Sequence, residues 1–129
     1  MMKSNNLKQL HRYFSSFCSK NIEDLKEIFS DDVKLVDWNN QYVGKDEVVK
    51  EVQSIFETFE SIQLDVINIY NSIDIIEDED SEVLLAIPSD NLFSCQIEIK
   101  FDGGDSLRII DLIEFNNDAQ IKNLTAYKR

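Results

Sequence analysis

Two aspartates occupy strand positions whose neighbours on the same face are apolar. Asp111 lies in the middle of a predicted strand, 107–115, on the face that also carries leucine, isoleucine and phenylalanine side chains. Asp37 ends the apolar face of another predicted strand, 33–38. Burial disfavours the charged form of a carboxyl group and raises its pKa, so that a neutral acid can result. Two such groups in different surroundings can divide the roles of acid and base, which is proton-transfer chemistry.

Each aspartate also has a structural interpretation, and the residues alone leave both interpretations open. Asp37 stands at a strand end and could accept the backbone hydrogen bonds of the Asn39–Asn40 turn, a common task of aspartate. A turn role does not apply to Asp111, which could instead be a buried acid bonded to a core hydroxyl group. Arg108, three residues earlier, faces the other side of the strand, so we do not expect it to pair with Asp111.

The other residue types that could do chemistry form no recognisable site. His11 is the only histidine, so a histidine cluster is impossible, and a structural role is favoured over a proton shuttle. Cys18 and Cys95 lie far apart and have no metal-ligand spacing. The acidic run 77–80 lacks the spaced ligands and the glycine of a calcium loop, which favours a solvated turn. We therefore expect no metal ion and no cofactor.

Length and charge narrow the class of protein. The chain has 129 residues and a net charge of −12, and 43% of its residues are hydrophobic, which predicts one globular domain over residues 1–129. Lysine and arginine form no cluster, so a partner that is a nucleic acid or an anionic membrane is not expected. The negative charge also disfavours a highly anionic ligand. No apolar signal core or spanning segment is present, and the expected location is cytoplasmic, with both thiols reduced.

The hydrophobic periodicity predicts three helices followed by a run of strands. The helices are expected over residues 4–20, 22–29 and 45–59, the last one directly after Gly44. The strands are expected over residues 33–38, 62–70, 72–76, 83–87, 95–101, 107–115 and 120–127. We further expect a bulge near Val66 and Ile67, a loop over 88–91 and a hairpin turn over 102–105.

This order predicts an α+β fold of a particular shape. Three N-terminal helices that pack on one side of a curved, mostly antiparallel sheet form a cone-shaped half-barrel. Such a sheet bent around a helix encloses a pocket. The element order therefore predicts one apolar pocket between the helices and the sheet.

Several stretches resemble ketosteroid isomerase. They are the segment from Arg12 to Asp37, with Phe29-Ser30-Asp31-Asp32 inside it, the strand Ile110–Asn116 and the closing strand Ile121–Tyr127. Tyr13 and Asp37 are 24 residues apart, which matches the spacing of that family's oxyanion-hole tyrosine and general-base aspartate. The chain is thereby identified with the nuclear transport factor 2-like superfamily, which includes the SnoaL-like proteins.

The resemblance implies roles for three residues and departs from the isomerase at three places. Asp37 would be the base, and Tyr13 with Asp111 would donate hydrogen bonds to the developing oxyanion. Tyr13 could equally be an ordinary core residue. Trp38 stands where the isomerase has proline, the loop from Asp37 to Gly44 is shorter, and Val52 replaces a supporting tyrosine. The expected pocket lining comprises Phe17, Trp38, Val52, Phe56, Ile109 and Ile113.

Two functions follow, and they belong to different classes. One is a protein without catalysis that binds a small apolar molecule or serves as an association domain, which the missing tyrosine network and the bulky Trp38 favour. The other is an isomerase or cyclase that moves a proton alpha to a carbonyl group by aspartate acid–base chemistry. In either case we expect a homodimer that associates through the partly apolar outer face of the sheet, around Ile110 and Leu112.

Overall fold

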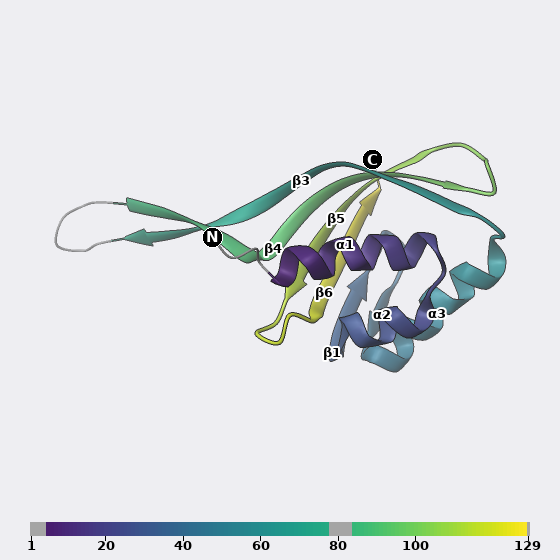
Figure 1. Cartoon of the computed structure of the whole chain (residues 1–129), viewed down its shortest axis with the longest axis horizontal. Coiled ribbons are helices and arrows are strands. Elements are labelled where there is room, and N and C mark those ends of the chain that lie inside the picture. The colour runs from purple at the N-terminus through teal and green to yellow at the C-terminus, as the bar shows by residue number, and fades with distance from the viewer. Residues whose placement is uncertain (1–4, 78–83, 129) are drawn as a thin grey trace.

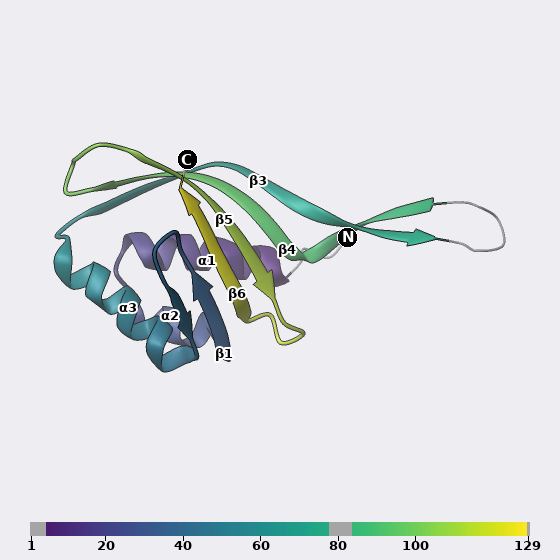
Figure 2. The same ribbon diagram turned by 180° about the vertical axis from the view of Figure 1, so that it is seen from behind.

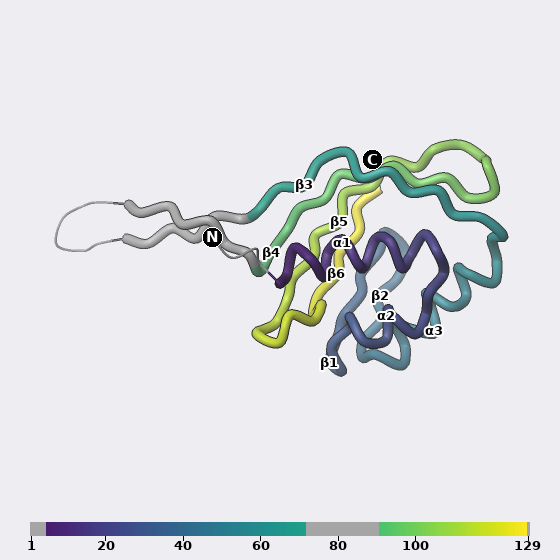
Figure 3. The backbone as a smooth tube through the Cα atoms, in the orientation of Figure 1, coloured from purple at the N-terminus to yellow at the C-terminus, as the bar shows by residue number. Residues whose placement is uncertain are grey.

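The computed structural model describes the backbone of residues 5–77 and 84–128, and the side chains of residues 5–71 and 91–128. These described residues form three helices and six strands. In chain order they are α1 Asn5–Cys18, α2 Ile22–Ile28, β1 Phe29–Val36, β2 Gln41–Val43, α3 Lys45–Thr58, β3 Ile62–Glu77, β4 Leu84–Phe101, β5 Leu107–Phe115 and β6 Ile121–Lys128. Figure 3 shows the backbone passing from α1 through α2 into β1, and from β2 through α3 into β3.

The helices begin and end where local chemistry requires it. Asn21 caps α2, because its side chain accepts a hydrogen bond of 3.1 Å from the backbone N–H of Asp24. Lys20 turns the chain between α1 and α2 with a φ of 57°, and its ammonium group donates to the backbone carbonyl groups of Phe56 and Phe59 at the end of α3. A cation at this end of a helix is favourable because the terminal carbonyl groups carry partial negative charge.

The six strands form one mixed sheet in the order β2-β1-β6-β5-β4-β3. β1 and β6 are parallel, and the other neighbouring pairs are antiparallel. The three helices cover one side of this sheet (Figure 1), and the view from behind shows β1, β5 and β6 in front of α1 (Figure 2). The sheet is curved and open, so the helices and the sheet together form the cone-shaped half-barrel that the sequence predicts.

Apolar side chains fill the space between the two layers. Leu10 of α1, Leu25 and Ile28 of α2, and Val33 of β1 are completely buried. Aromatic rings link α1 to the neighbouring elements: the Phe17 ring stands edge-on to Phe56 of α3, with ring centroids 5.4 Å apart. No helix of the described residues is long and apolar enough to cross a membrane.

The helix predictions hold, whereas the strand predictions need correction. The predicted strands 62–70 and 72–76 are one strand, β3, and the predicted strands 83–87 and 95–101 belong to one strand, β4. The three helices and the α+β class are confirmed, and the register slips between Val66 and Asn68, where the bulge was predicted. The first strand is wrong by four residues at its start, because Phe29 already pairs with Ile121 of β6. The predicted loop 88–91 is wrong, since the backbone of β4 continues through it.

The remaining differences concern β2 and the acidic run. β2 was not predicted at all, because three residues are too few to show a periodicity. The predicted acidic turn 77–80 lies outside the described residues, except for Glu77.

Candidate functional site

A cavity of about 230 Å³ lies between α1, α3 and the concave face of the sheet. Aliphatic and aromatic side chains from every strand except β2 form most of its wall. Its lining also contains three carboxyl groups and one phenol, from Asp37, Glu51, Asp111 and Tyr13. We call the part of the lining with the buried residues Tyr13 and Asp111 the inner end, and the more exposed part with Asp37, Glu51 and the half-exposed Trp38 the mouth. Concave, mostly apolar sites with a few polar groups are typical of small-molecule binding.

Asp111 is the buried polar group of this cavity. It lies on β5 between Ile109 and Ile113, and only 6% of its surface is exposed. Burial raises the pKa of its carboxyl group to about 7, so the neutral and the ionised form are both populated near neutral pH. Among the described residues, no side chain or backbone group hydrogen-bonds to this carboxyl group, and its oxygen atoms keep contact with the cavity. Within the part of the chain whose side chains are described, the alternative of a core hydroxyl partner is therefore not realised.

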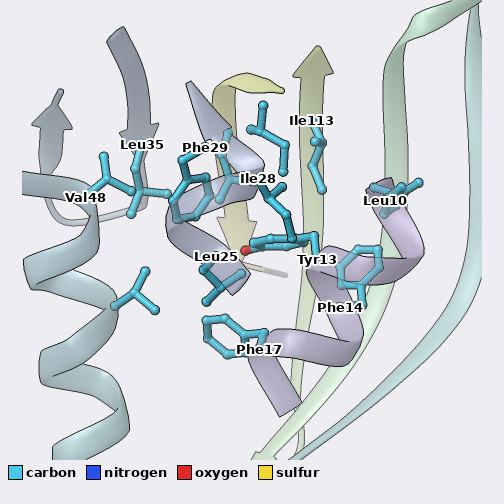
Figure 4. Packing of buried hydrophobic residues seen from close by; sticks show 14 of the residues in the cluster. Leu10, Tyr13, Phe14, Phe17, Leu25, Ile28, Phe29, Leu35, Val48 and Ile113 are labelled. Atoms are coloured by element: carbon cyan, nitrogen blue, oxygen red, sulfur yellow. The ribbon is translucent and has the colours of Figure 1, made fainter. Parts of the chain in front are cut away.

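Tyr13 reaches the same cavity from the helical layer. Its ring extends from α1 toward the side of β1 and α3, where Leu35 and Val48 lie (Figure 4). The residue is 5% exposed, and its ring stands edge-on to Phe14 at a centroid distance of 5.3 Å. Burial raises the pKa of the Tyr13 hydroxyl group well above its usual value, and the charge of Asp111 adds to the rise. The hydroxyl group therefore stays protonated and can donate a hydrogen bond.

Asp37 lines the cavity mouth and also caps a turn. Its Oδ1 atom accepts hydrogen bonds from the backbone N–H groups of Asn39 and Asn40, at 2.8 and 2.7 Å. Its own N–H group donates to the carbonyl group of Asn40 at 3.0 Å. The turn role is thus realised, while the residue still belongs to the cavity lining. These bonds hold the carboxylate in a fixed orientation beside the cavity.

Glu51 of α3 is a further carboxyl group of the lining that the sequence interpretation missed. It lies next to Tyr42 of β2. Burial is the largest cause that raises the pKa of the Tyr42 hydroxyl group, and the hydrogen bond to Glu51 is the second. A signal existed in the sequence: Glu51 stands three residues after Val48 and four before Ile55, which places it on the apolar side of α3.

Trp38 forms the rim of the mouth. It is 45% exposed, and the ammonium group of Lys128 lies 5.9 Å from the centre of its ring. This is cation–π distance, so the ring face at the mouth is already suited to a positive charge.

The predicted ligand-binding residues fall into two groups. Phe17, Trp38, Val52 and Ile109 line the cavity together with Tyr13, Asp37 and Asp111. Phe56 and Ile113 are buried in the neighbouring core instead and do not belong to the lining. Ile113 lies two residues beyond Asp111 on the same face of β5, where it is completely buried.

The residues to which the sequence assigns no role in the site lie outside the cavity. His11 is exposed to solvent and is not at the cavity. Arg108 is on the outer face of the sheet, where its Nε atom lies 3.4 Å from Glu98. The part of the chain whose side chains are described contains no group of three or more histidine, cysteine, aspartate or glutamate residues arranged to hold a metal ion.

Solved structures share this fold at low sequence identity. Nuclear transport factor 2 from Cryptosporidium parvum aligns with a TM-score of 0.70 at 14% identity, covering 96% of this chain and 91% of its own. A proposed ketosteroid isomerase from Kribbella flavida reaches 0.73 at 11% identity, covering 97% and 78%. A proposed polyketide cyclase from Sinorhizobium meliloti reaches 0.68 at 10% identity, covering 92% and 93%.

These likenesses show the fold alone, because they lie at 10 to 14% identity. No curated protein matches this chain in sequence. A family model does match: the SnoaL-like domain, over residues 10–123. The match includes Tyr13, Asp37 and Asp111, and it extends over most of the chain. The protein therefore belongs to the SnoaL-like family.

Proposed function

We propose that this protein binds a small, mainly apolar molecule in the cavity between the helices and the sheet. The observation that carries the proposal is Asp111, a buried carboxyl group that lines an apolar cavity and has no hydrogen-bond partner among the described residues. A buried polar group without a partner is costly, and a ligand that offers it one recovers that cost. Tyr13 supplies a second polar contact at the same end of the cavity.

The protein carries its own reporter for this proposal. Trp38 is the only tryptophan, and it stands at the cavity mouth. Adamantanemethanol is a suitable probe because it combines a compact apolar cage with one hydroxyl group. Titration should change the Trp38 fluorescence in a saturable manner. Val52→Phe places a larger side chain in the cavity wall and should abolish the change. An unsaturable response, or an equal response in Val52→Phe, would contradict the proposal.

A second candidate function is acid–base catalysis on a cyclic carbonyl compound. It is favoured by one specific observation: Tyr13, Asp37 and Asp111 all line the same cavity. Asp37 would take the proton alpha to the carbonyl group, and Tyr13 with protonated Asp111 would stabilise the enolate oxygen. The supporting tyrosine is absent, because α3 has Val52 at that position. Positioned groups without their supporting contacts often lose activity, which makes binding the first choice.

Hydrogen–deuterium exchange separates the two candidates. Cyclohexenone is incubated with the protein in deuterated buffer, and NMR follows the exchange of its alpha protons. Catalysis predicts exchange that is faster than in buffer and that falls to the buffer rate in Asp37→Asn. Exchange at the buffer rate in the wild-type protein supports binding without chemistry.

We also propose a homodimer and a cytoplasmic location. The dimer proposal is supported by exposed apolar residues on the outer sheet face: Ile67 and Tyr70 of β3 and Tyr127 of β6 are each more than half exposed. Strand register places Tyr127 beside Ile110 on that face. A second copy of this chain would cover these residues. The cytoplasmic location is supported by Cys18 and Cys95, which are both free thiols.

A further inference from the structure

The charged side chains that line the cavity all have one sign. Its lining contains the carboxyl groups of Asp37, Glu51 and Asp111, and none of the lining residues is a lysine, an arginine or a histidine. The whole chain carries a net charge of −12, so no distant excess of positive charge compensates the lining. Clefts with apolar walls and charges of one sign concentrate ligands of the opposite sign and repel those of the same sign.

Asp111 provides a fixed anchor at the inner end. The residue is 94% buried, belongs to the cavity lining and lacks a hydrogen-bond partner within the described part of the chain. Its carboxyl group already lost most of its hydration when the protein folded. A cation that enters the cavity therefore meets an anion that needs little further dehydration, and their attraction is strong because the surroundings are apolar.

The mouth is suited to a cation as well. Asp37 and Glu51 lie there beside Trp38, whose ring already has the Lys128 ammonium group at 5.9 Å. This contact shows that the Trp38 ring accepts an alkylammonium group; Lys128 itself does not belong to the lining. A positively charged ligand would be attracted at the mouth before its apolar body enters.

We propose that the cavity selects an apolar amine, whose ammonium group pairs with the Asp111 carboxylate while its hydrocarbon body contacts the aliphatic wall. This inference rests on the proposed binding function and names the chemical class of its ligand. An apolar carboxylate of the same shape is rejected by Asp37, Glu51 and Asp111. A neutral alcohol of that shape binds through its hydrocarbon body alone, with one hydrogen bond at the inner end.

The groups that face Asp111 leave its charge uncompensated. Tyr13 faces it from α1, Cys95 stands opposite it on β4, and Ala126 stands opposite it on β6. Burial raises the pKa of the Cys95 thiol to about 12 and that of Tyr13 well above 10, so both groups are neutral at about pH 8. The other acidic side chains of the lining are Asp37 and Glu51. Among the residues that line the cavity, no cation competes with the ligand for Asp111.

Three probes with one skeleton and different charges test the proposal. Adamantanemethylamine, adamantanemethanol and adamantanecarboxylate are titrated at about pH 8 and followed by calorimetry and Trp38 fluorescence. The amine should bind at least about tenfold more tightly than the alcohol, which corresponds to about 1.4 kcal/mol. The carboxylate should bind most weakly. Asp111→Asn should bring the amine to the affinity of the alcohol, whereas Asp118→Asn, the same charge change at an exposed turn outside the cavity, should leave the order unchanged.

The outcomes separate this inference from the binding function itself. If the alcohol or the carboxylate binds as tightly as the amine, the selection of a cation is overturned while the cavity remains a ligand site. If the amine keeps its advantage in Asp111→Asn, the assignment of Asp111 as its partner is overturned. If none of the three probes binds, the binding function fails together with the inference.

A second readout needs no variant: the affinity of the amine should rise from about pH 6 to about pH 8, because Asp111 ionises while the ammonium group keeps its proton.

Discussion

Tyr13 on α1 and Asp111 on β5 line one cavity from opposite layers of the fold. Burial raises the pKa of both groups, and the charge of Asp111 raises that of Tyr13 further. The two groups therefore differ in what they can do near neutral pH. Tyr13 remains a hydrogen-bond donor, whereas Asp111 changes between donor and anion with its own protonation.

Asp111 should make the stability of the protein depend on pH. Its pKa is about 7 in the folded protein and about 3.9 in an unfolded chain, so the folded state retains a proton that the unfolded state releases. The free energy of unfolding should then fall as pH rises between these values. From about pH 5 to about pH 8 the loss due to Asp111 is about 3 kcal/mol.

Urea unfolding of wild type and Asp111→Asn at these two pH values measures this loss. The free energy of unfolding of the variant, relative to that of wild type, should rise by about 3 kcal/mol from the lower to the higher pH. The cost of placing an amide group at this position is the same at both pH values and does not affect this change. Asp118→Asn should shift the curve by the same amount at both pH values. A difference between Asp111→Asn and wild type that is independent of pH would show that Asp111 is not buried as described.

The cavity predicts opposite results for two neighbouring positions on α3. Val52 lines the cavity, so phenylalanine at this position has free volume to occupy and should leave the free energy of unfolding nearly unchanged. Val48 is completely buried and does not line the cavity, so Val48→Phe should overpack the core and cost about 1–3 kcal/mol. Chemical denaturation of the two variants checks this. Equal losses in both would argue that the cavity is absent in solution.

Asp37 should contribute to stability through its turn. Asp37→Ala removes the acceptor of the Asn39 and Asn40 N–H groups and should cost about 1 kcal/mol. Asp37→Asn keeps a side-chain oxygen at Oδ1 and should cost less. Thermal denaturation compares the two variants, and an alanine variant as stable as wild type would remove the turn role.

The outer sheet face predicts the oligomeric state. Light scattering should give twice the chain mass of 15.0 kDa, and Tyr127→Arg should lower the mass by placing a charge in the apolar face. Ser15→Arg adds the same charge at an exposed position of α1 and serves as the control. A wild-type protein that scatters as a single chain would refute the dimer.

The inward position of Asp111 was predictable because it depends on local geometry alone. Side chains alternate along a strand, so Ile109, Asp111 and Ile113 had to share one face, and all three are buried. The bulge near Ile67 followed from the same alternation, which slips there. The helices were predictable as well, because the spacing of apolar residues along a helix also depends on local geometry alone.

Long-range pairing and shared roles were not predictable in this way. The early start of β1 depends on the pairing of Phe29 with Ile121, more than ninety residues away, which no local pattern reveals. The placement of Phe56 and Ile113 outside the cavity depends on how α3 lies on the sheet. The sequence allows Asp37 to be either a turn cap or a cavity residue, and the structure combines the two positions in one side chain.

Methyl NMR with adamantanemethanol tests the central claim most directly, because it locates the bound molecule. The account predicts saturable shifts of the cavity methyl groups of Ile97, Ile109 and Leu124, with little change at the buried Ile28 and Ile121, which do not line the cavity. Shifts confined to the outer face at Ile110 and Leu112, or no saturable shifts at all, would contradict it.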